Sequence, residues 1–176
     1  IPYFLHILYT IIPKNAIKPQ FVTSKDQIIV SFQHFQNNML YLYGVVLDQY
    51  GKMTMPVQVL DSVRASASAA RRKYDFYDQV VSNDKSKIAF YIIKEVEQQS
   101  VLETYLYDHN LNFVAQQQLI LNGQSSIFPQ QILLGNNAQL YIASYYYHQQ
   151  ENQLNDKAQI LKLNIKEQAI VQYNIP

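Results

Sequence analysis

Short apolar runs separated by polar turns recur three times along this chain. A polar turn leads into an apolar run at Asp26–Phe32, at Lys85–Ile93 and at Asn137–Ala143. Roughly 20–24 residues after each of them comes a second segment that reads as strand, tight turn and strand. A repeat of about 50–60 residues that contains only short strands is typical of propeller blades. The pattern therefore predicts a fold, but it does not predict a chemical function.

Each repeat predicts four antiparallel strands joined by short turns. Asp and Asn favour these turns because their side chains bond the backbone and tolerate a left-handed φ. The predicted strands of the first repeat are 21–23, 27–34, 40–47 and 54–60; those of the second are 77–81, 87–94, 101–107 and 113–121; those of the third are 130–134, 139–147, 158–163 and 169–174. Polar loops are predicted at 95–99 and 148–156.

The second strand of each repeat is apolar on both of its faces. In the first repeat, Ile28, Val30 and Phe32 alternate with Ile29 and Ser31. A sheet with one face in water would alternate apolar and polar residues more cleanly. Apolar residues on both faces are expected when each sheet packs between two others, as propeller blades do. A β-sandwich with irregular patterning is the alternative that this pattern leaves open.

The predicted fold is all-β, a partial β-propeller of about three and a half four-stranded antiparallel blades. Its parts are a half blade at 1–19, a blade at 20–60, an inserted linker at 61–76, and blades at 77–121 and 129–176. In the half blade, 16–18 is expected to be a short last strand. Propellers carry 4–8 blades, so we expect this chain to be part of a larger propeller. An uncovered blade would leave a bare apolar face.

The predicted linker holds every arginine of the chain: Arg64, Arg71 and Arg72. Its alanines favour one or two helical turns over 61–73, which would place the three arginines on one face. Arginine makes bidentate contacts and is enriched at protein interfaces. We interpret the cluster as a candidate docking patch for a protein partner, against the alternative of a solvated linker.

The densest aromatic run is Tyr145-Tyr146-Tyr147. Alternation along a strand places Tyr145 and Tyr147 on one face. They form either an aromatic platform for a sugar or a peptide, or part of the packing between blades.

Composition excludes several function classes. The chain has 176 residues, of which 48% are hydrophobic and 15% charged, which is enough to build a core. A net charge of +1 argues against nucleic-acid binding, and the absence of Cys excludes disulfides, thiolate chemistry and Cys-ligated metals. The four His lack metal-ligand spacing, and neither a phosphate loop nor a nucleophile elbow occurs. We predict no enzyme activity, no cofactor and no metal.

The apolar start of the chain, residues 1–12, is too short to span a bilayer, so no membrane span is predicted. It also lacks the features of a signal peptide.

Residues 80–91 and 104–112 resemble a blade of a WD40-like β-propeller of the Tyr-, Asn- and Gln-rich Bacteroidetes type. The Trp-Asp and Gly-His signatures of true WD40 repeats are missing, and the matched residues form turns, so no functional residue is carried over. The resemblance implies the periplasm or cell envelope of a Gram-negative bacterium. It also implies a non-catalytic protein-interaction or scaffold module of an envelope assembly. A glycan-binding or glycan-processing propeller is the alternative.

Overall fold

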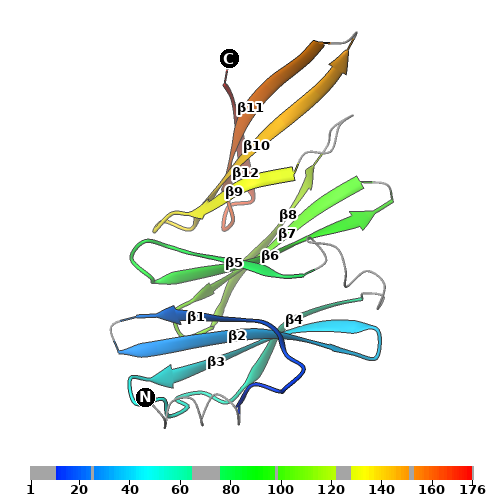
Figure 1. Cartoon of the computed structure of the whole chain (residues 1–176). Helices are drawn as coiled ribbons and strands as arrows, with labels where there is room; N and C mark the ends of the chain where they lie inside the picture. The colour runs from blue at the N-terminus through cyan, green and yellow to red at the C-terminus, as the bar shows by residue number, and fades with distance from the viewer. Residues whose placement is uncertain are drawn as a thin grey trace. The chain divides into compact units, whose positions relative to one another are not determined.

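The computed structural model describes residues 11–24, 26–64, 76–97, 99–121, 128–150 and 153–175. Within these ranges the strands β1 to β12 form three four-stranded antiparallel sheets (Figure 1). Each sheet is made by one continuous stretch of chain, and its strands are paired in chain order. This up-and-down order is that of propeller blades, and the predicted all-β fold class is confirmed.

The N-terminal sheet contains β1 (Ile17–Thr23), β2 (Gln27–Gln36), β3 (Met39–Asp48) and β4 (Gln58–Arg64). The middle sheet contains β5 (Asp78–Val81), β6 (Lys87–Val96), β7 (Gln99–Asp108) and β8 (Phe113–Leu121). The C-terminal sheet contains β9 (Phe128–Leu134), β10 (Gln139–Gln150), β11 (Gln153–Asn164) and β12 (Ala169–Ile175). The middle sheet follows the predicted boundaries most closely, and the predicted last strand at 113–121 is found as β8.

Side chains of Asn and Asp form the turns, as predicted. Asn37 and Asn38 connect β2 to β3 with positive φ angles of 53° and 61°, which fit the right-handed twist of a two-residue hairpin. After β3, the Asp48 carboxylate accepts bonds from the backbone N–H groups of Tyr50 and Lys52, each 2.9 Å long. Local bonds of this kind fix where one strand ends and the next begins.

The predicted linker at 61–76 is wrong at its start, because β4 occupies 58–64 rather than the predicted 54–60. Thr54 donates from its backbone N–H to the carbonyl of Val46, and Met53 forms a bridge with Leu47. These contacts fold the segment after β3 into a loop against that strand, so β4 begins four residues later than predicted. Residues 61–64 are therefore extended and not helical. Residues 65–75 lie outside the described residues.

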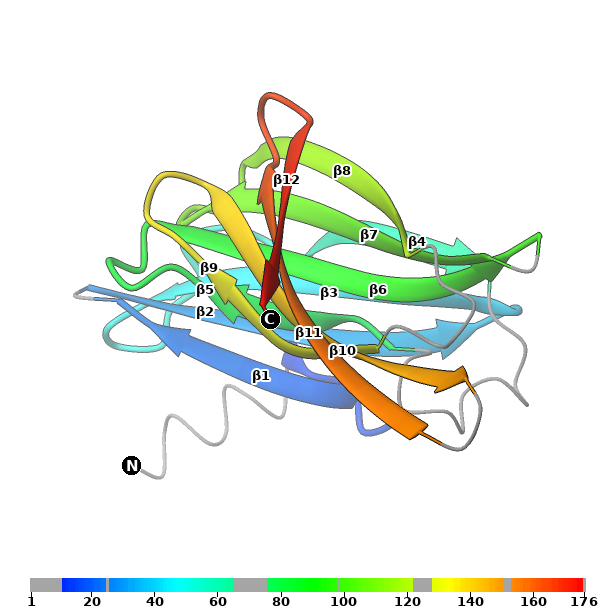
Figure 2. The same ribbon diagram turned by 90° about the horizontal axis from the view of Figure 1, so that it is seen from above.

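Both predicted polar loops are shorter than expected. Val96 pairs with Gln99 at the end of the β6–β7 hairpin, and Gln150 pairs with Gln153 at the end of the β10–β11 hairpin. In Figure 2, β10 and β11 form a long paired ribbon. Backbone hydrogen bonds of a ladder do not depend on side-chain polarity, so polar residues extend these strands instead of ending them.

The predicted half blade at 1–19 is only partly described, since residues 1–10 are outside the described ranges. Its expected last strand at 16–18 is wrong, because Ile17 and Lys18 belong to β1 and Ile17 pairs with Gln33 of β2. The register shifts between Ile17 and Gln20, and Lys18 has a φ of 49°. Proline in the intervening position lacks an N–H, and a bulge accommodates it within the strand.

The chain divides into two compact units, residues 1–77 with 109–111 and residues 78–108 with 112–176. In the first unit, Val30, Val45 and Leu47 form a buried cluster that Ile11 and Ile12 cover. In the second unit, one continuous core joins the middle and C-terminal sheets. Its largest fully buried side chains are those of Leu102, Leu106, Leu140, Ile142 and Leu163. The predicted packing of one sheet on another therefore holds within the second unit.

The described residues include no helix of the length and hydropathy that crossing a membrane requires.

Candidate functional site

Over β9 to β11 the C-terminal sheet has one buried face and one accessible face that carries apolar side chains, and its edge strand β12 is exposed on both faces, with Ile170 45% exposed. Leu134, Leu140 and Leu163 point into the core. Successive side chains of a strand point to opposite faces, so the residues next to these leucines lie on the other side of the sheet. There Leu133 of β9 is paired with Tyr141 of β10, which is paired with Lys162 of β11. A second aligned row, formed by Ala143, Ile160 and Tyr173, crosses the same side of the sheet. The two rows also contain the polar residues Gln131 and Lys162. We define the outer apolar face by their apolar members, Leu133, Tyr141, Ala143, Ile160, Val171 and Tyr173.

Three members of the outer apolar face are about half exposed. The exposed fractions are 54% for Leu133, 46% for Val171 and 51% for Tyr173. Tyr141, Ala143 and Ile160 are partly buried between them. Single exposed apolar residues are normal, whereas several apolar side chains grouped on one side of a sheet form a candidate interaction surface.

The predicted aromatic residues lie in the same sheet. Tyr145 and Tyr147 belong to β10, and their Cα partners in β11 are Ala158 and Asp156. Their side chains lie outside what the structure describes. The sequence drew attention to this part of β10 through its density of Tyr, but it missed Leu133 and Val171 because single apolar residues carry no signal.

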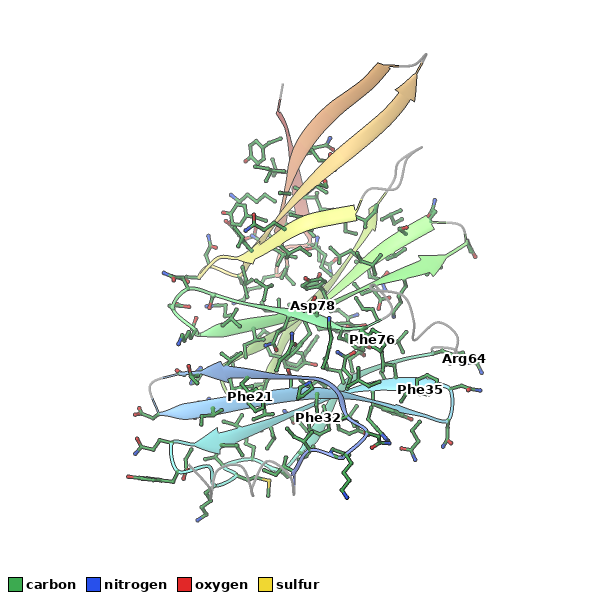
Figure 3. All side chains as sticks on the ribbon, in the orientation of Figure 1. Phe21, Phe32, Phe35, Arg64, Phe76 and Asp78 are labelled. Carbon is green, nitrogen blue, oxygen red and sulfur yellow. The ribbon has the colours of Figure 1, made fainter. Side chains whose placement is uncertain are left out.

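The predicted arginine patch is described at only one position. Arg64 is the exposed last residue of β4, where it pairs with Met39 (Figure 3). Arg71 and Arg72 lie outside the described residues. Arg64 belongs to the first unit and the tyrosines of β10 to the second, so the two predicted groups belong to separate bodies.

Sequence reasoning missed a charged network around Glu103, in the middle of β7. Glu103 forms an ion pair with Lys94 and accepts bonds from the Tyr105 hydroxyl at 2.8 Å and the Gln118 amide at 3.0 Å. Its side chain is only 12% exposed. A lone Glu within the apolar run of β7 is the signal that could have revealed it.

The Glu103 network has the character of a structural ion pair. Both carboxylate oxygens already accept bonds, Oε2 from Lys94 and Tyr105 and Oε1 from Gln118. A mostly buried carboxylate needs this many donors because its desolvation is costly. Acid–base catalysis would need a lone pair or proton aimed at a substrate, and these bonds use the carboxylate within the sheet.

The carboxylates in the turns also accept hydrogen bonds from residues of the same turn. Asp84 accepts bonds from the hydroxyl of Ser82 at 2.6 Å and from the backbone N–H of Ser86 at 3.0 Å. These bonds, with that of Ser82 the strongest, lower the pKa of Asp84 to about 2. The Asp108 carboxylate accepts in the same way from the backbone N–H of Asn112. Such carboxylates form turns, and the glycan-processing alternative gains no converging carboxylate pair from them.

In the part of the chain that the structure describes, no three His, Asp or Glu side chains are grouped as metal ligands would be.

Comparison with known proteins leaves the family open. No protein-family model and no curated protein matches the chain. Among solved structures, it is similar to two point mutants of Synechocystis apocarotenoid oxygenase, at 9% and 8% identity. Each covers 89% of this chain and 38% of the oxygenase, with a TM-score of 0.47. A chimera of apocarotenoid oxygenase and RPE65 is similar at 8% identity, over 84% of this chain and 34% of its own, with a TM-score of 0.46. The chain thus spans less than two fifths of these proteins, and such values assign it neither a family nor an activity.

Proposed function

We propose that this chain is a non-catalytic protein-interaction module whose outer apolar face receives another protein. The observation that carries the proposal is the half exposure of Leu133, Val171 and Tyr173 on one side of the C-terminal sheet. Covering such side chains is worth about 25 cal/mol for each Å² removed from water. The face lies on a hydrogen-bonded sheet, so little backbone entropy would be lost on binding.

The repeat indicates what kind of partner fits this face. β6 and β10 both begin directly after a polar turn, at Lys87 and Gln139, and this alignment equates Ala89 with Tyr141. Val80 pairs with Ala89 as Leu133 pairs with Tyr141. The outer apolar face is therefore the counterpart of the middle-sheet face that carries Val80 and Ala89.

In the middle sheet, this counterpart face is the one that the C-terminal sheet covers. Val80, Ala89 and Leu106 belong to the core shared by the two sheets, opposite Leu140 and Leu163. The outer apolar face occupies the same strand positions, and no sheet among the described residues covers it. It differs in having Lys162 at the position of Leu106. The partner that fits is a further four-stranded antiparallel sheet that presents Leu and Ile side chains on one face. The setting that the resemblance implies, a bacterial cell envelope, is part of this proposal.

A site-specific crosslinking experiment tests the proposal. A photoreactive phenylalanine analogue replaces Val171 in the full-length protein expressed in its native host, and the crosslinked peptides are identified by mass spectrometry. The matched control carries the analogue at Tyr50, which is 80% exposed in a turn of the first unit.

The expected result is a crosslink from position 171 to strands of a four-stranded sheet, in the same or another protein, and no such product from position 50. Crosslinks to helical segments, or a yield at position 171 no higher than at position 50, would overturn the proposal.

A further inference from the structure

Polar side chains interrupt the apolar core between the middle and C-terminal sheets. Thr104 of β7 pairs across the strands with Gln117 of β8, and Ser144 of β10 pairs with Gln159 of β11. All four are buried, with exposed fractions of 1%, 6%, 1% and 2% in that order. We refer to these four residues as the polar band.

Strand alternation places both pairs on the faces that pack together. Thr104 lies between Leu102 and Leu106, which both belong to the core shared by the two sheets. Gln117 lies between Ala115 and Leu119, which pack in the same core. In the C-terminal sheet, Ser144 follows the core residues Leu140 and Ile142 at the same alternation, and Gln159 precedes Leu161 and Leu163.

The two pairs also lie at similar distances from one end of the sheets. At that end, the backbone N–H of Asp84 donates to the Asn136 side chain at 3.1 Å, and the Lys87 ammonium donates to the Asn136 carbonyl at 2.6 Å. Tyr91, the cross-strand partner of Thr104, comes four residues after the start of β6. Ser144 comes five residues after the start of β10. With a rise of about 3.3 Å per residue, both pairs lie roughly 13–17 Å from the joined turns.

Three oxygen atoms of the polar band lack a hydrogen-bond partner among the described residues. They are Thr104 Oγ1, Gln117 Oε1 and Gln159 Oε1. The one bond within the band that the structure shows runs from the Gln159 amide nitrogen to the Ser144 hydroxyl, at 3.1 Å. Buried polar atoms are nearly always satisfied, since an unpaired one costs about 1–3 kcal/mol. Three such oxygens in the core between the same two sheets indicate bound groups that supply donors.

We infer that the polar band is a binding site for ordered water between the two sheets. The two Gln Oε1 atoms can only accept, so the ligand must donate, and one water molecule donates two hydrogen bonds. The hydroxyl of Thr104 can donate or accept, so it too can bond water, and an internal water makes about two to four such bonds. None of the four side chains is charged, so a neutral ligand suits the site better than an ion.

Water bound here would add directional bonds to the apolar part of the interface, beyond the bonds to Asn136 that already join the turns of the two sheets. A directional hydrogen-bond bridge favours one alignment of the two sheets.

The inference is tested first on the unchanged protein. Nuclear Overhauser effects from water to the backbone N–H groups of Thr104 and Gln159 detect water that resides in the core. The expected result is a cross-peak at both sites, together with electron density for water between these side chains in a high-resolution crystal structure. Absence of both signals would overturn the inference without relying on any variant.

A variant test depends on the sign of a stability change. In the Thr104→Val/Gln117→Leu double variant, a bound water would lose two partners, and the melting temperature is expected to fall by about 2–4 °C. The water cross-peak at Gln159 should also be lost. The control is Gln116→Leu, because Gln116 neighbours Gln117 in β8 but is exposed.

A rise in melting temperature of the double variant would mean that the unpaired atoms are dry, and it would overturn the inference. The control variant is expected to change neither the melting temperature nor the water signal.

Discussion

The side-chain amide of Gln33 bonds both backbone groups of Tyr77. Gln33 Nε2 donates to the Tyr77 carbonyl, and Gln33 Oε1 accepts from the Tyr77 N–H, each at 2.8 Å. Gln33 and Tyr77 are each 1% exposed, and the Tyr77 hydroxyl bonds the carboxylate of Asp61 in β4. One side chain thus takes the place of a strand neighbour and fixes the segment that precedes β5.

Replacing Gln33 with Leu is expected to lower the free energy of unfolding by about 2–4 kcal/mol. The substitution removes the two buried hydrogen bonds that Gln33 makes to the backbone N–H and carbonyl of Tyr77. Urea denaturation measures the change. Gln36→Leu, at an exposed position of the same strand, serves as the control and is expected to cost less than about 0.5 kcal/mol. Equal stability of the two variants would contradict a structural role for the paired bonds.

A side chain at Gly44 is expected to destabilise the first unit in proportion to its size. A Cβ atom at Gly44 would lie 2.7 Å from Cδ1 of Leu111 and 2.8 Å from Cδ1 of Leu60. Both contacts are with the ends of leucine side chains, so Gly44→Ala is expected to cost about 1 kcal/mol and Gly44→Val about 2–3 kcal/mol. Thermal unfolding monitored by circular dichroism gives the order.

The matched variant for Gly44 is Gly44→Ala combined with Leu60→Ala, which removes one of the two close contacts. If the crowding of leucines is the cause, the second substitution is expected to cost less in the Gly44→Ala background than alone. Additive losses would show that crowding at Leu60 is not the cause.

Breaking the ion pair at Glu103 from one side is expected to cost more than its removal from both sides. Lys94→Met leaves a carboxylate that is only 12% exposed without its cation, and we expect a loss of about 1–3 kcal/mol. Glu103→Gln in the Lys94→Met background should recover part of that loss, because it removes the uncompensated charge. A double-mutant cycle by chemical denaturation measures the coupling.

Lys52→Met is the control for the loss of a lysine, since Lys52 is exposed in a turn of the N-terminal sheet. It is expected to change stability by less than about 0.5 kcal/mol. A coupling energy near zero between positions 94 and 103 would mean that the ion pair contributes nothing measurable.

The turn at Asp84 is expected to weaken in acid. Its pKa is lowered from 3.8 to about 2, chiefly by the Ser82 hydroxyl and then by Ser86. A folded-state pKa below the unfolded value gives a stabilising contribution that is present above about pH 4 and is lost as the pH falls toward 2. Carbon-detected NMR of the carboxyl groups is expected to show that Asp84 titrates near pH 2.

Asp84→Asn should reduce the acid sensitivity of the melting temperature between about pH 4 and pH 2. Asp26→Asn, in the turn before β2, changes the net charge equally and is the control. An Asp84 carboxyl that titrates near 3.8 would exclude the proposed role of the serine hydroxyls.

Local chemistry makes much of this fold readable in the sequence. β8 was predicted at its observed bounds, and the turns at Asp48 and Asp108 follow from side chains that bond their own backbone. Such signals act over four or five residues, so one sequence contains them in full. The apolar faces of β6 similarly predicted a sheet that packs on another, and the middle sheet does share its core with the C-terminal sheet.

Tertiary contacts decided what local signals could not. β4 begins at Gln58 because Met53 and Thr54 first form backbone contacts with β3. The residues of β4 contain no signal that predicts these contacts. Glu103 is held by Lys94 and Gln118 from the two neighbouring strands, so its environment depends on register.

The sequence by itself determined the three four-stranded repeats, the order of their strands and the chemistry of their turns, since each depends on neighbours along the chain. Only the tertiary structure decided that Leu133 and Val171 share an exposed face and that Thr104 and Gln159 belong to facing sides of one core. Those relationships join residues far apart in the sequence, and the packing of complete sheets brings them together.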